Sequence, residues 1–131
     1  MSREEIIALS KYAEDMIENS LENPQMEKKL LNLAESHLET LLEEWKVECI
    51  DTETGLIHSR LGIVKLAKKE YEEAKKCFLD ALSNLIVRGE YCQDRALSHW
   101  QLGKTYLKLE NKSEAKENFI RAIQIYDSLA M

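Results

Sequence analysis

Apolar side chains recur every three or four positions along most of this chain, which is the period of one face of an α-helix. The clearest stripe runs through Leu30, Ala34, Leu38, Leu41 and Trp45. Six such stripes predict an all-α protein of about six helices. The first helix is expected from Ser2 to the Asn23-Pro24 step, and the others at about residues 25–48, 54–68, 71–85, 91–109 and 112–128.

The predicted helix ends rest on residues that cap or break helices. Ser2 begins the spacing of a capping box, and Pro24 keeps the residue before it out of the helical conformation. The run from Asp51 to Gly55 is rich in capping and turn residues, so we expect a turn there before the third helix. Gly89 suits a stop after the fourth helix, and Asn111 a break between the last two.

The last two pairs of predicted helices repeat one another at a spacing of 41 residues. A leucine–glycine pair, two alanines, a phenylalanine and a histidine recur at this displacement. They are His58, Leu61, Gly62, Ala74, Phe78 and Ala81 in the first copy, and His99, Leu102, Gly103, Ala115, Phe119 and Ala122 in the second. Because one helical hairpin cannot bury its apolar face alone, such units are expected to stack.

The small residues predict how the two helices of a hairpin touch. We expect Gly62 and Gly103 to let the first helix approach the second closely. The small side chains of Ala74 and Ala115 on the second helix are expected to pack against these glycines. The phenylalanine one turn later is expected to fill the gap between its own hairpin and the neighbouring one.

The N-terminal part of the chain is a weaker copy of the same unit. Its second predicted helix matches the clear repeats at a displacement of 40 residues, which aligns Ala34 with Ala74 and Leu38 with Phe78. We therefore expect a single domain in three parts, which are a degenerate acidic hairpin at residues 1–50, a first clear repeat at 51–90 and a second at 91–131.

This pattern resembles the tetratricopeptide repeat family, in its variety with repeats of about 40 residues. The resemblance covers residues 55–131 well and 25–50 weakly. It departs from the usual repeat of about 34 residues, and His58 and His99 stand where a tryptophan is usual. The resemblance implies a fold of right-handed helical hairpins and a module that binds proteins or peptides without catalysis. The residues that carry it best are Leu102, Gly103, Tyr106, Ala115, Phe119 and Ala122.

In this family the first helices of the hairpins line a concave groove, and the resemblance implies which residues face it here. The aliphatic members of this set and Trp100 would form an apolar strip bordered by two lysines. Such a strip suits a peptide with an apolar anchor and acidic flanks, or an amphipathic helix. In the alternative, Trp100 packs against a neighbouring helix and meets no partner. The implied groove residues are Ser59, Ile63, Leu66, Ala67, Trp100, Lys104, Leu107 and Lys108.

Charge narrows the range of partners. The chain has 18 basic and 24 acidic side chains, a net charge of −6, and its first 50 residues hold five basic and twelve acidic ones. Without a basic face, nucleic acid is not an expected partner. No apolar run approaches the ~18–20 residues that span a bilayer, so no membrane contact is expected. The polar start and the three cysteines, Cys49, Cys77 and Cys92, predict a cytoplasmic protein with reduced thiols.

The sequence lacks the motifs of catalytic and cofactor sites. A glutamate three residues before a histidine, as in di-iron bundles, is missing at His37, His58 and His99. Glycine-rich phosphate loops are missing too. The equivalent places of His58 and His99 allow either a metal site or helix packing, and packing is preferred. We expect no enzymatic activity, no cofactor and no metal.

These observations predict an interaction module or adaptor that binds a peptide or an amphipathic helix in its groove. The alternative is a self-associating structural or scaffold protein, with a homo-oligomer interface at Ile123, Tyr126, Leu129 and Met131. A further hypothesis is that the acidic N-terminal hairpin folds over the lysine-bearing groove and competes with the ligand.

Overall fold

A computed structural model describes residues 3–22, 24–45, 51–85 and 92–130, and these residues form α-helices joined by short turns. The described part of the chain contains no strand, so the prediction of an all-α fold with six helices is confirmed. The helices are α1 (Arg3–Glu22), α2 (Glu27–Trp45), α3 (Asp51–Ala67), α4 (Tyr71–Asn84), α5 (Cys92–Lys108) and α6 (Lys112–Ala130), with a 3₁₀ turn η1 (Pro24–Met26) between α1 and α2.

The helix boundaries follow the prediction except at the start of α3. The prediction of a turn at 51–55 is wrong, because α3 begins at Asp51. Gly55 lies inside the helix, where an added Cβ would be 3.2 Å from the carbonyl oxygen of Ala81 and 3.0 Å from Cγ of Leu85. The glycine therefore serves close packing of α3 on α4, rather than a turn. Ser2 and Gly89 lie outside the described residues.

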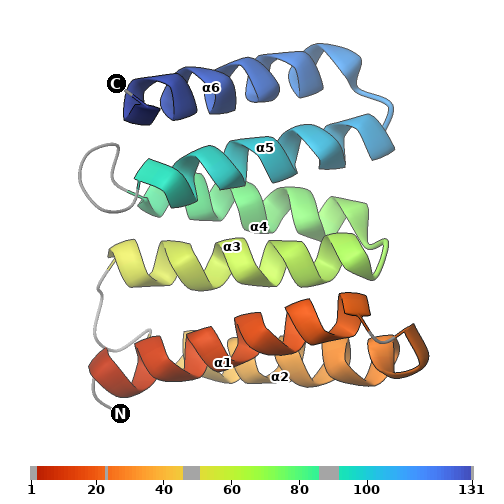
Figure 1. The fold of residues 1–131 in the computed structure, drawn as a ribbon, viewed down its shortest axis with the longest axis vertical. Coiled ribbons are helices and arrows are strands. Elements are labelled where there is room, and N and C mark those ends of the chain that lie inside the picture. Colours follow the sequence, from red (N-terminus) through yellow and green to blue (C-terminus); the bar gives the residue numbers. More distant parts are fainter. Residues whose placement is uncertain (1–2, 23, 46–50, 86–91, 131) are drawn as a thin grey trace.

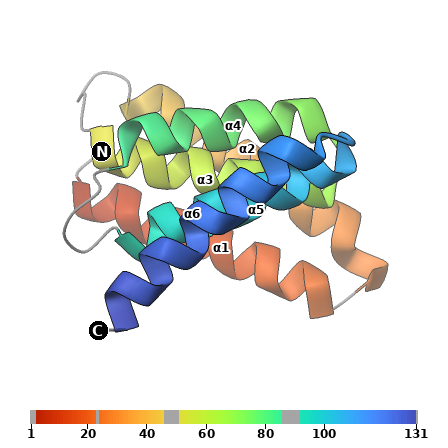
Figure 2. The same ribbon diagram turned by 90° about the horizontal axis from the view of Figure 1, so that it is seen from above.

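The six helices form three antiparallel hairpins, α1–α2, α3–α4 and α5–α6, stacked along the long axis of the molecule (Figure 1). Neighbouring hairpins join through α2 with α3 and through α4 with α5. Viewed along the stack, α2 and α4 lie on one side and α1 on the other (Figure 2). The first helices also contact one another, α1 with α3 and α3 with α5, so they share one face of the stack.

The turns inside the two clear repeats have the same backbone geometry. Lys69 and Glu110, which are 41 residues apart, are the two described non-glycine residues with positive φ, at 65° and 61°. Each closes the first helix of its hairpin, as a left-handed residue commonly does. The next residue directly precedes the second helix, and Oδ1 of Asn111 accepts the N–H of Glu114 at 3.2 Å. The predicted break at Asn111 is therefore a helix cap.

The repeat glycines lie under phenylalanine rings. A Cβ added at Gly62 would be 2.7 Å from Cε1 of Phe78, and one at Gly103 would be 2.8 Å from Cδ1 of Phe119. All three nearest atoms at each glycine belong to the ring, so the ring predicted to lie between hairpins also covers the glycine of its own hairpin. Phe78 also clusters with Leu102 of the next hairpin, as expected for a residue between repeats.

The N-terminal hairpin joins the stack through a shared core and an ion cluster. Ala34 and Leu38 of α2 are fully buried in one apolar cluster with Ile57 of α3. At the edge of this cluster Glu35 accepts from Lys65 at 2.6 Å and also from Lys68. Burial of Glu35 acts to raise the pKa of its carboxyl, but the hydrogen bonds from both lysines outweigh this and lower the pKa.

Candidate functional site

The candidate site is the face that α1, α3 and α5 share. Side chains of α3 that lie three or four residues apart, from Leu56 to Ala67, fall on one side of that helix. Those of α5 from Asp94 to Lys108 do the same. Two cavities open on this face, one toward each end of the two helices, and we call them together the α3–α5 groove.

The first cavity, which we call the lysine cavity, lies where α3 and α5 end. It has a volume of about 620 Å³, apolar walls and a basic rim. Within the described part of the chain, Lys69, Lys104 and Lys108 form no ion pair, so their charges are available to a ligand. The lining residues are Leu66, Ala67, Lys69, Tyr71, Lys104, Leu107 and Lys108.

The second cavity, the acidic cavity, lies toward the start of α3 and α5 and also takes residues from α1. Three carboxylates and one cation, Arg60, line it, and Arg60 donates to Oε2 of Glu14 at 2.9 and 3.2 Å. Burial raises the pKa of the Asp94 carboxyl, although the charge of Arg60 acts against this. The lining residues are Glu14, Ile17, Glu18, Leu56, Ser59, Arg60, Ile63, Asp94 and Leu97. The groove therefore has one basic and one acidic end.

Ser59 contacts the neighbouring helix and exposes little of its surface to the groove. Only 5% of its surface is exposed, and its hydroxyl is 3.0 Å from that of Ser98 on α5. The bond joins the first helices of two consecutive hairpins and leaves little of Ser59 for a partner. The side chain forms part of the acidic cavity wall, as does Ile63.

Trp100 lies on the side of α5 that faces α6. Its ring meets that of Phe119 edge to face, with the ring centroids 4.7 Å apart, and 40% of the residue remains exposed. The contact agrees with the alternative in which Trp100 packs on a neighbouring helix, and the exposed part stays open to a partner. Trp100 does not line either cavity of the α3–α5 groove.

The N-terminal hairpin leaves the lysine cavity open. Every residue that lines this cavity comes from α3 to α5 or the turn between α3 and α4. The acidic side chains of α1 that reach the groove, Glu14 and Glu18, lie in the acidic cavity. Glu35 of α2 pairs with Lys65 and Lys68 instead. For the described residues, the hypothesis that the acidic hairpin covers the lysines is therefore wrong.

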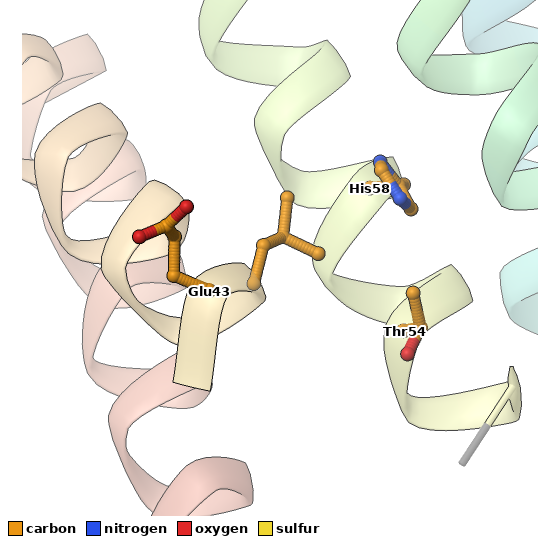
Figure 3. Close-up of a pocket in the computed structure, with 4 residues that line it drawn as sticks. Glu43, Thr54 and His58 are labelled. Atoms are coloured by element: carbon orange, nitrogen blue, oxygen red, sulfur yellow. The ribbon is translucent and has the colours of Figure 1, made fainter. Parts of the chain in front are cut away.

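The repeat histidines serve different contacts. Nδ1 of His99 donates to Oδ1 of Asn118 at 3.0 Å and so ties α5 to α6. Nδ1 of His58 is buried and has no hydrogen-bond partner among the residues that the structure describes. His58 lines a third cavity with Leu42, Glu43 and Thr54, between α2 and α3 (Figure 3). In Figure 3 the carboxylate of Glu43 points away from the His58 ring, so these side chains do not converge as a catalytic set would.

Both histidines make stability depend on pH. Burial is the main cause that lowers the pKa of His58 and of His99 below the ordinary value of 6.5. The unfolded chain then binds protons more readily than the folded one. The histidines therefore do not lower the free energy of unfolding above pH 6.5, and this free energy falls as the pH drops below that value. Urea unfolding at several pH values tests this. In the double variant H58Q/H99Q the free energy of unfolding should depend much less on pH in this range. An unchanged dependence on pH would contradict the assignment.

The chain belongs to the tetratricopeptide repeat family, because the family model matches residues 53–128, more than half of its length. No curated protein and no solved structure matches it. Members of this family generally mediate protein–protein interaction, and their repeats are typically non-enzymatic. None of the described helices combines the length and apolar composition that crossing a bilayer requires.

The structure adds residues to the groove that the sequence did not reveal. The acidic cavity brings in Glu14 and Glu18 from α1, together with Arg60 and Asp94. Arg60 and Asp94 share a helix face with predicted groove residues, so the spacing of three and four could have found them. The α1 residues carry no such signal, because α1 does not follow the repeat pattern.

Proposed function

We propose that this chain is an adaptor module that binds a peptide segment of a partner protein in the α3–α5 groove. The observation that carries the proposal is the lysine cavity, in which Lys104 and Lys108 border the exposed side chain of Leu107 and form no ion pair within the described chain. An unneutralised cation beside an exposed apolar side chain is the complement of an acidic residue beside an apolar one. The remaining predicted residues, Ser59, Ile63, Leu66 and Trp100, belong to this proposal as the walls and edge of the groove.

The opposite end of the groove limits how such a peptide lies. Glu18 and Asp94 line the acidic cavity, and Arg60 there already pairs with Glu14. An acidic residue placed at that end would meet like charge, which costs affinity. The acidic part of the peptide therefore occupies the lysine cavity.

We include in the proposal that the protein acts in the cytoplasm with reduced thiols. Burial raises the pKa of Cys77 to about 11, which keeps this side chain a protonated thiol. The pKa supports a packing role for Cys77 over a nucleophilic one.

A displayed library of random twelve-residue peptides tests the groove. Peptides selected by the wild-type chain should be enriched in acidic residues next to a large apolar residue. The double variant K104E/K108E should bind the selected peptides about tenfold more weakly or worse, because two attractive charges become repulsive. Fluorescence anisotropy with the selected peptides measures the change.

The matched control is K112E/K116E, which reverses the charges of two lysines on α6 that have the same spacing and lie outside both cavities. It should bind the selected peptides as the wild type does. If the library yields no binder, the proposed function is wrong. If the selected peptides bind K104E/K108E unchanged, the lysine cavity is not the site.

A further inference from the structure

One side of α6, next to the face that packs on α5, has the composition of a buried face. Its residues match, at a displacement of 41, the face of α4 against which α5 packs. Phe78 of α4 and Leu85, the residue that follows α4, are buried, at 0% and 4% exposed. Their equivalents on α6 are Phe119, which is partly exposed, and Tyr126, which is 42% exposed. Ile123, between them, is 50% exposed.

Among the described elements, α6 contacts α5 alone (Figure 1). These exposed and partly exposed residues follow one line on the helix, at Lys116, Phe119, Ile123 and Tyr126. Steps of three, four and three residues are those of the apolar seam between two paired helices. The line is therefore shaped to receive another helix.

The charges on this line show which helix fits it. Lys116 lies toward the start of α6 and Asp127 toward its end, both exposed and without an ion pair in the described part of the chain. Phe119 and Ile123 are each two residues from position 121, and Lys116 and Tyr126 are each five residues from it. A second α6 laid antiparallel about this midpoint would set Phe119 against Ile123, and Lys116 against Tyr126 beside Asp127.

The antiparallel arrangement is favourable at every one of these positions. It gives two equal apolar pairs, and at each end a lysine beside an aromatic ring and a carboxylate. In a parallel pair Lys116 would meet Lys116, and Asp127 would meet Asp127, which is unfavourable. The line is thus complementary to its own copy.

We propose that two copies of this chain associate antiparallel through α6, along the line from Lys116 to Asp127. The contact is isologous, so each copy uses the same residues. It leaves the α3–α5 groove free, because neither cavity includes a residue of α6. A pair of adaptors would then present two peptide grooves at once.

Sedimentation velocity of the 131-residue chain, from about 10 μM to about 1 mM, tests the proposal. The wild-type mass should rise from 15.2 kDa toward twice that value. K116E and D127K should each weaken association about tenfold or more, since each sets like charges together at both ends. The double variant K116E/D127K restores opposite charges and should restore association.

The matched control is K75E, which makes the same charge change at the equivalent place on α4 and should leave association unchanged. I123D should abolish association while unfolding in urea as the wild type does, because the side chain is exposed. A wild-type mass that stays at 15.2 kDa over the whole range would overturn the proposal. So would association that ignores the single variants, or a double variant that stays weak.

Discussion

Replacing Phe78 by alanine is expected to lower the free energy of unfolding by about 3–5 kcal/mol, the usual cost of removing a fully buried phenylalanine. The ring is 0% exposed, covers Gly62 of α3 and clusters with Leu102 of α5. It therefore stabilises both the α3–α4 hairpin and the contact of that hairpin with the next. A loss of this size is a large part of the stability of an ordinary small domain.

Urea unfolding measures the effect, and Leu79→Ala is its control. Leu79 is the next residue of α4 and is exposed, so its truncation should change the free energy of unfolding by less than about 0.5 kcal/mol. Equal effects of the two substitutions would show that Phe78 does not join the repeats as described.

Gly62→Val is expected to cost about 1–3 kcal/mol, because it adds atoms to a fully packed contact. A Cβ at this position would already lie 2.7 to 2.9 Å from three atoms of the Phe78 ring. Since that ring is completely buried, it has no free space into which to move. The clash outweighs the helix propensity that valine gains over glycine, which is a fraction of a kcal/mol.

The second repeat offers an internal comparison. Gly103→Val meets Phe119 at the same distances to within a tenth of an ångström, but Phe119 is partly exposed. Its ring has room to shift, so this substitution should cost less than Gly62→Val. Urea unfolding of the two variants side by side decides the order. A reversed order would mean that the ring and glycine contact does not limit packing.

The repeat could be predicted from the sequence because each unit keeps its small and large residues at fixed places. Gly62 and Phe78 recur as Gly103 and Phe119, and they mark the contact that the structure shows. The spacing does not predict that the ring is the nearest group to each glycine, because a spacing along the chain gives the face of a residue but not the atom it meets. The sequence predicts a turn at Gly55, since sequence alone does not distinguish a glycine that breaks a helix from one that lets a neighbour approach.

Half of the groove could be foreseen and half could not. Lys104, Leu107 and Lys108 follow from repeat positions, and they do lie together with Leu66 at one cavity. The acidic cavity depends on how α1 packs beside α3, and α1 lacks the repeat pattern that would have given its register. The bond between Ser59 and Ser98 also depends on stacking between hairpins, which no spacing within one hairpin reveals.

Binding of a peptide in the α3–α5 groove is the central claim, and NMR of the ¹⁵N-labelled chain tests it most directly. A peptide selected from the random library is titrated into the protein, and the amide shifts of each residue are followed. The largest changes should fall at Leu66, Lys104 and Leu107, around the lysine cavity. Changes confined to the opposite side of the stack, on α2 and α4, would contradict the claim.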